Sequence, residues 1–123
     1  TIQQLLLPNK QVIVFLDIPE LPNLPIDCVQ SGMTCSAPIS NVHKRQVFLR
    51  ETLTKLQHEF PQMRVFDPTA LFCDATTCNY TRGDVVLYRD SHHLTLGGSA
   101  IYGQRFSTWL NPTATTPTQP SLA

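Results

Sequence analysis

Apolar residues are concentrated in three short runs, which predicts three short β-strands. The segment from Gln11 to Ile18 is apolar at nearly every position and rich in branched residues, which is typical of a strand buried on both faces in a parallel sheet. Residues Met63 to Phe66 and Val85 to Tyr88 are shorter runs of the same kind. Asp67-Pro68 ends the second run, and Asp17-Ile18-Pro19 ends the first.

Two longer segments are predicted to be helical. In residues 41–60 charges alternate with apolar positions that recur at helical spacing, namely Val42, Leu49, Leu53 and Leu56. Ser40 is a suitable N-cap for this helix, and Pro61 ends it. A second helix is expected from Thr95, as its N-cap, to about Leu110, and a single turn over Thr69–Leu71.

Strands that alternate with helices predict the α/β class, since right-handed crossovers place such strands in one parallel sheet. Three strands are few for an open sheet, so we expect the C-terminal part of a doubly wound domain over residues 1–110. Residues 19–38 contain four prolines and are expected to form an irregular loop. Residues 111–123 are rich in Pro and Thr and are expected to form a disordered tail or linker.

Composition narrows the class of protein. Apolar residues make up 41% of the chain, and nine basic residues balance nine acidic ones. This neutral balance without a basic stripe argues against nucleic acid and anionic membrane surfaces as partners. The longest apolar run, Val12 to Leu16, has strand length and cannot span a bilayer.

Four cysteines fall in two local pairs, Cys28 with Cys35 and Cys73 with Cys78. Neither pair has the C-x-x-C spacing of zinc or redox sites. Each pair could close a small loop as a disulfide, which would indicate an oxidising compartment such as a periplasm or the cell exterior. The alternative is four unpaired buried thiols.

Candidate chemistry follows the third predicted strand, where Asp90 stands three residues before His93. Ligands of open α/β sheets bind beyond the carboxyl ends of the strands. A histidine there can act as a general base if a carboxylate fixes its tautomer, and Asp90 can do so from the same turn. A metal site is not expected here, because the adjacent His92 and His93 should point in different directions and no closed zinc site is evident.

The stretch "YRDSHHLTLGGSAIYG" resembles the final block of the SGNH (GDSL-like) hydrolases, an Asp-x-x-His followed by Leu, a small hydroxyl residue and a glycine-initiated helix. It is most similar to the SGNH domain fused to the membrane-embedded acyltransferase family 3 module of bacterial O-acetyltransferases. The order of "LFCDATTCNYTRGDVVLYRDSHHLT", with its Cys-to-Cys loop and Gly-Asp turn, and the earlier "VIVFLDIPELP" also resemble that branch. The similarity covers roughly residues 11–106.

The resemblance implies an SGNH/flavodoxin-like three-layer α/β/α fold with His93 as catalytic base and Asp90 as its orienting acid. It further implies acetyl transfer onto a cell-envelope glycan, such as lipopolysaccharide O-antigen or peptidoglycan, at the periplasmic or extracellular face of the inner membrane, with no cofactor. The family's Gly-Asp-Ser nucleophile block has no counterpart in this chain. We therefore expect a truncated domain that is inactive alone and whose bare sheet edge favours a homodimer. A free carbohydrate esterase and a non-catalytic glycan- or partner-binding domain are the alternatives.

Overall fold

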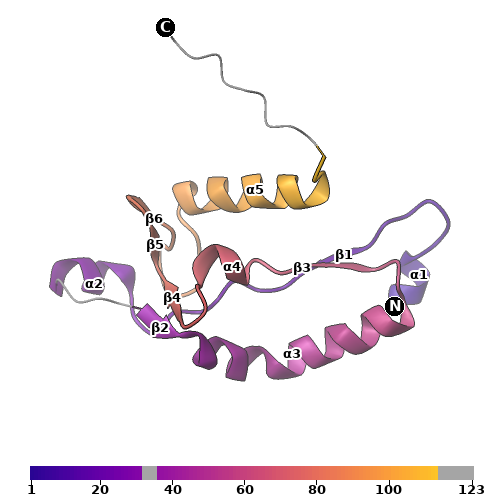
Figure 1. Cartoon of the computed structure of the whole chain (residues 1–123), viewed down its shortest axis with the longest axis horizontal. Coiled ribbons are helices and arrows are strands. Elements are labelled where there is room, and N and C mark those ends of the chain that lie inside the picture. The colour runs from indigo at the N-terminus through magenta and orange to yellow at the C-terminus, as the bar shows by residue number, and fades with distance from the viewer. Residues whose placement is uncertain (32–35, 114–123) are drawn as a thin grey trace, which may run out of the picture.

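The computed structural model describes residues 1–31 and 36–113 of the 123-residue chain (Figure 1). The helices are α1 (Ile2–Leu5), α2 (Pro25–Ser31), α3 (Ile39–Glu59), α4 (Thr69–Phe72) and α5 (Leu96–Leu110). The strands are β1 (Ile13–Phe15), β2 (Ser36–Pro38), β3 (Arg64–Phe66), β4 (Thr77–Asn79), β5 (Thr81–Arg82) and β6 (Val85–Val86).

Strands β1 and β3 form a parallel pair. The connection between them contains α3 and makes a β-α-β crossover. Ile13 lies opposite Arg64 and Phe15 lies opposite Phe66. The pairing continues one residue further, where the Leu16 amide donates to the Phe66 carbonyl over 2.9 Å. The first two predicted strands are therefore confirmed, although β1 is shorter than the predicted range of 11–18.

Helices cover both sides of this parallel pair, with α3 on one side and α5 on the other (Figure 1). Leu53 of α3 joins Leu16 and Met63 in one buried cluster. Toward α5, the Phe66 ring lies 5.2 Å from the ring of Phe106, measured between centroids, and it also contacts Tyr102 and Trp109. The α/β class is thus confirmed, whereas a doubly wound sheet stays a prediction, since the described residues contain two parallel strands.

The third predicted strand does not join the parallel sheet. Val85–Val86 instead pairs with Thr81–Arg82 in an antiparallel hairpin. The connecting turn is Gly83-Asp84, and Gly83 has a φ of 56°, a backbone conformation that favours glycine. A tight local turn therefore decides the partner of this apolar run, and the prediction of three strands in one parallel sheet was wrong on this point.

The proline-rich segment 19–38 is more regular than predicted, because it contains α2 and the strand β2. Strand β2 pairs antiparallel with β4, where Ala37 lies opposite Cys78. Helix α3 follows directly and begins at Ile39, so the prediction of Ser40 as its N-cap was wrong. The Ile39 amide instead donates to the Thr76 carbonyl over 2.9 Å, which satisfies one of the free amides at the helix start.

The predicted bond between Cys73 and Cys78 is confirmed, with an S–S distance of 2.04 Å. Asp74 stabilises the loop that this bond closes, since its carboxylate accepts the amides of Thr76 and Thr77, each over 2.8 Å. These amide hydrogen bonds, first that of Thr76, lower the pKa of Asp74 to about 2. Cys35, the predicted partner of Cys28, lies outside the described residues, as do residues 114–123 of the predicted tail.

Candidate active site

The candidate residues lie in a short connection between Tyr88 and α5 that is closed by backbone hydrogen bonds. Tyr88 and Leu94 form an antiparallel bridge, and the Arg89 amide donates to the His93 carbonyl over 2.8 Å. Thr95 then caps α5, as predicted, because its hydroxyl accepts the Gly98 amide over 2.9 Å. The loop is therefore held at both ends by regular structure.

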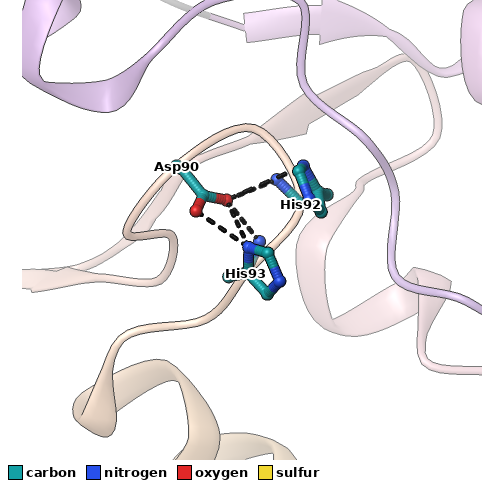
Figure 2. A group of neighbouring side chains, drawn as sticks. All are labelled: Asp90, His92 and His93. Atoms are coloured by element: carbon teal, nitrogen blue, oxygen red, sulfur yellow. Dashed lines mark hydrogen bonds and ion pairs between the residues drawn. The ribbon is translucent and has the colours of Figure 1, made fainter.

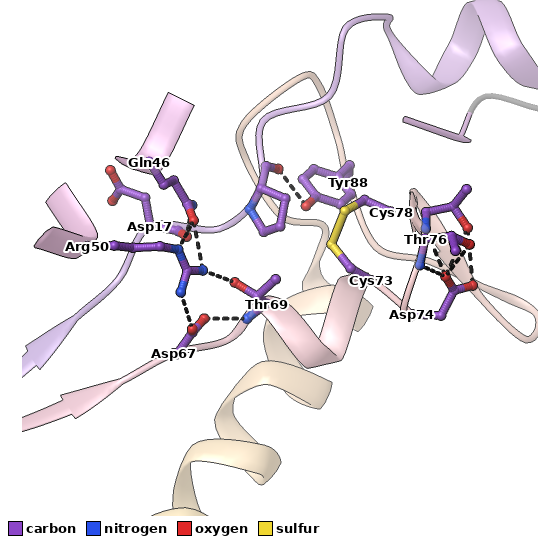
Figure 3. The surroundings of a disulfide bond; sticks show 12 residues. Asp17, Gln46, Arg50, Asp67, Thr69, Cys73, Asp74, Thr76, Cys78 and Tyr88 are labelled. Atoms are coloured by element: carbon purple, nitrogen blue, oxygen red, sulfur yellow. Dashed lines mark hydrogen bonds and ion pairs between the residues drawn. A yellow bond between two sulfur atoms is a disulfide. The ribbon is translucent and has the colours of Figure 1, made fainter. Parts of the chain in front are cut away.

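A second set of contacts fixes this loop against the segment that follows β1. The buried Tyr88 hydroxyl donates to the Pro19 carbonyl over 2.7 Å (Figure 3), and the Leu21 amide donates to the Ser91 carbonyl over 2.8 Å. Burial raises the pKa of Tyr88 well above its usual range, so this phenol remains a hydrogen-bond donor. The candidate residues are thus positioned beyond the carboxyl end of β1, where ligands of α/β sheets bind.

The structure brings together the two residues predicted as a catalytic pair. His93 Nδ1 lies 2.8 Å from Asp90 Oδ2 and 3.0 Å from Asp90 Oδ1 (Figure 2). With the proton on Nδ1, His93 donates to the carboxylate and its Nε2 is left with a lone pair. This is the arrangement that a histidine base needs, because the carboxylate fixes both ring orientation and tautomer.

Asp90 also organises the loop backbone. Its Oδ1 accepts the amide of His93 over 2.7 Å and that of His92 over 3.0 Å. The hydrogen bond from the His92 amide, together with those from the His93 side chain and amide, outweighs partial burial and holds the pKa of Asp90 well below its usual range. Asp90 is therefore a carboxylate at neutral pH, ready to accept from His93 and to stabilise an imidazolium there.

His92 lies beside His93, and the expectation that the two adjacent side chains point in different directions was wrong. The ring centroids are 4.2 Å apart, and the tight turn over Asp90 brings the side chains to the same side (Figure 2). His92 is exposed, and its Nδ1 lies 2.9 Å from the Ser91 hydroxyl. Asp90, His92 and His93 together offer ligand atoms of the kind that metal ions bind.

A cavity of about 660 Å³ adjoins the pair through His92, which lines it. Polar side chains from two segments contribute to its wall. Asp17 and Glu20 lie in the segment after β1, and Arg45 and Gln46 lie on α3. Arg45 Nη1 and Glu20 Oε2 form an ion pair of 2.7 Å. The cavity therefore offers hydrogen-bond donors and acceptors close to the candidate base.

Sequence analysis did not single out a polar cluster at the carboxyl end of the parallel pair. Arg50 of α3 donates to Asp67 Oδ2 over 2.8 Å, to Thr69 Oγ1 over 2.9 Å and to the Gln46 side-chain oxygen (Figure 3). Burial alone would raise the pKa of Asp67, but hydrogen bonds from Thr69 and Arg50 outweigh it and lower the pKa. Asp17 and Asp67 each follow a parallel strand, which is the signal that points to this edge of the sheet.

Comparison with known protein families identifies the type of domain. The chain matches the SGNH domain that is fused to AT3 domains, over residues 1–108. The chain belongs to this SGNH family. Membership links it to acyltransferase and esterase-like chemistry and to a membrane acyltransferase module in the same protein. No curated protein and no solved structure matches the chain. Among residues 1–31 and 36–113, no helix is long and apolar enough to cross a membrane.

Proposed function

We propose that this SGNH domain transfers an acetyl group by a Ser-His-Asp mechanism in which His93 is the general base and Asp90 orients it. The observation that carries the proposal is the contact of His93 Nδ1 with both oxygens of Asp90, on a loop that the backbone holds closed. The family match supports an acyl-transfer or esterase-like reaction for a domain that contains this pair.

The steps follow from the free lone pair on His93 Nε2. The serine hydroxyl gives its proton to Nε2 while its oxygen forms a bond to the acyl carbon, and Asp90 stabilises the imidazolium. The imidazolium then protonates the leaving group, which departs and leaves an acyl-serine. A sugar hydroxyl next gives its proton to Nε2 and attacks the acyl carbon, and the serine regains a proton as the new ester leaves.

The nucleophile in this proposal comes from outside the 123 residues, since the chain contains no Gly-Asp-Ser triplet. The family places that block, together with most of the oxyanion hole, before the segment that carries Asp90 and His93. The chain alone is therefore expected to be inactive. The part supplied here is the acid–base pair and the neighbouring cavity.

For the acceptor, we propose a hydroxyl of a cell-envelope glycan at the periplasmic or extracellular face of the bacterial inner membrane. The cavity beside His92 supports this choice, because its carboxylates, guanidinium and amide match the hydroxyl groups of a sugar. The Cys73–Cys78 disulfide favours an oxidising compartment. The acyl group would come from the AT3 module of the same protein.

Hydrolysis of a simple aryl acetate tests the proposal, measured for this chain and for the full protein. We expect the full protein to hydrolyse the ester and this chain by itself to be inactive. His93→Ala should abolish it, and Asp90→Asn should lower kcat on the order of 10³–10⁴-fold, because the tautomer of His93 is no longer fixed. Asparagine keeps an oxygen that can accept the loop amides, so this variant should fold normally. His43→Ala, which removes an exposed histidine of α3, is the matched control and should leave the rate unchanged.

Near-normal rates for His93→Ala or Asp90→Asn in the full protein would refute the assignment. Activity of this chain alone would place the nucleophile among its own serines. An added glycan distinguishes transfer from the esterase alternative, since an acceptor should suppress release of free acetate only if transfer is the reaction. Glycan binding without hydrolysis in the full protein would instead favour a binding domain.

A further inference from the structure

Asp90, His92 and His93 place three ligand-type atoms on one side of the loop. These atoms all lie within 4.8 Å of one another, and within residues 1–31 and 36–113 no other group of three such side chains is found. His92 Nδ1 lies 3.8 Å from Asp90 Oδ1, and His93 Nδ1 lies 3.0 Å from the same oxygen. The two imidazoles are roughly half exposed, with 59% and 53% of their side-chain surface accessible, so an ion can approach from solvent.

We propose that these three side chains form an inhibitory site for a divalent transition-metal ion that binds imidazole, with Zn²⁺ as the representative case. Zn²⁺ binds imidazole nitrogen and carboxylate oxygen at about 2.0–2.2 Å, so two ligands of one tetrahedral ion lie about 3.3–3.5 Å apart. The observed separations of 3.0 and 3.8 Å lie on either side of this value. All three atoms already lie within 4.8 Å of one another, so rotation of the exposed side chains can bring them to one ion, and water completes the coordination.

His92 adds to the catalytic pair a third metal-ligand side chain that the general-base mechanism does not use. The general-base mechanism uses only Asp90 and His93, yet His92 lies with its ring 4.2 Å from that of His93. The Ser91 hydroxyl lies 2.9 Å from His92 Nδ1 and holds this ring in place. If the hydroxyl donates, Nδ1 carries a lone pair, and rotation of the hydroxyl frees it for a metal ion.

Metal binding and the base function of His93 exclude each other. An ion on His93 Nδ1 displaces the proton that Nδ1 donates to Asp90. The neutral imidazole then carries its proton on Nε2, after exchange with solvent. Nε2 then cannot accept the proton of the serine. An ion on Nε2 occupies the same lone pair directly. The metal site itself is independent of the proposed function, whereas the inhibition rests on it.

The experiment measures metal binding and hydrolysis separately, both in the full protein. Competition with a chromophoric zinc chelator gives the affinity and stoichiometry for Zn²⁺, and aryl acetate hydrolysis with added ZnCl₂ gives the inhibition, which EDTA should reverse. Groups that only support metal ligands change affinity about 10–100-fold, so His92→Ala should weaken Zn²⁺ binding and inhibition at least about tenfold. Because His92 also lines the cavity proposed for the acceptor, inhibition of each variant is expressed relative to its own rate without metal.

His43→Ala is the matched control, because His43 is an exposed histidine outside the cluster. It should change neither binding nor inhibition. Mg²⁺ should not inhibit, since it prefers oxygen ligands in octahedral geometry. Zn²⁺ affinity that is equal in wild type and His92→Ala would overturn the metal site. Hydrolysis that persists when the His92-dependent site is filled would overturn the inhibition. His92-dependent binding in a protein without any hydrolysis would uphold the site and count against the proposed function.

Discussion

Replacement of Gly98 by alanine should destabilise the protein, because it forces α5 away from the segment that leads to the candidate site. Gly98 lies in the first turn of α5 and is buried. A Cβ atom built there overlaps the Leu87 carbonyl oxygen and lies 3.0 Å from both the carbonyl carbon and the Cα of Leu87. These are backbone atoms of the segment that precedes Asp90, so no side-chain rotation relieves the contact.

The magnitude follows from two opposing effects. Overpacking in a well-packed core typically costs about 1–3 kcal/mol of stability, whereas alanine is favoured over glycine in a helix interior by about 1 kcal/mol. Gly103 provides the matched control in the same helix, because it is exposed and a Cβ there meets nothing within 4 Å. Gly103→Ala should therefore stabilise the protein by up to about 1 kcal/mol. Because the helix preference applies to both positions, the two variants should differ by the overpacking cost alone, about 1–3 kcal/mol.

Equilibrium unfolding in urea measures the change in the free energy of unfolding for both variants. Trp109, the only tryptophan of the chain, reports the undocking of α5 by fluorescence because its ring packs against Phe66. Far-UV circular dichroism follows the helices in parallel. In the full protein, Gly98→Ala should also reduce ester hydrolysis, while Gly103→Ala should not. A Gly98→Ala variant as stable as Gly103→Ala would refute the close packing of α5 on Leu87.

Two further predictions concern contacts around the site. Tyr88→Phe should cost about 1–2 kcal/mol in the free energy of unfolding and lower the hydrolysis rate, because it leaves the Pro19 carbonyl without its donor; unchanged stability by urea unfolding would contradict the role of this bond. The folded-state pKa of Asp67 lies below its ordinary value of 3.8. The ionised carboxylate therefore stabilises the fold above pH 3.8, and this stabilisation is lost as the pH falls through the folded-state pKa. The stability advantage of the wild type over Asp67→Asn should accordingly shrink below about pH 4, and an advantage that grows on acidification would show that the sign is wrong.

The parts of the site that sequence analysis anticipated are those encoded by neighbouring residues. Asp90 and His93 are three residues apart, so one turn brings them together, as the 2.8 Å contact confirms. The cap formed by Thr95 and the bond between Cys73 and Cys78 are equally local. Such features depend on spacing and residue type alone, which the sequence contains directly.

Features that depend on tertiary placement were missed. A short apolar run such as Val85 to Tyr88 indicates a strand but does not identify its partner. The Arg50 cluster joins α3 to the end of β3 and exists only because the crossover places the helix there. The orientation of His92 depends on how Asp90 folds the backbone back on itself, which two adjacent histidines in a sequence cannot reveal.

Under the proposed mechanism, the closed loop between Tyr88 and Leu94 has a consequence for how the acid–base pair meets the nucleophile. The acid and the base are joined by so few residues that closing the loop costs little chain entropy. The pair is thus built independently of the segment that would carry the proposed nucleophile, and in that proposal the two parts need only be docked at the correct distance. A domain organised in this way suits complementation between separately produced segments, with the acid–base pair supplied complete by one of them.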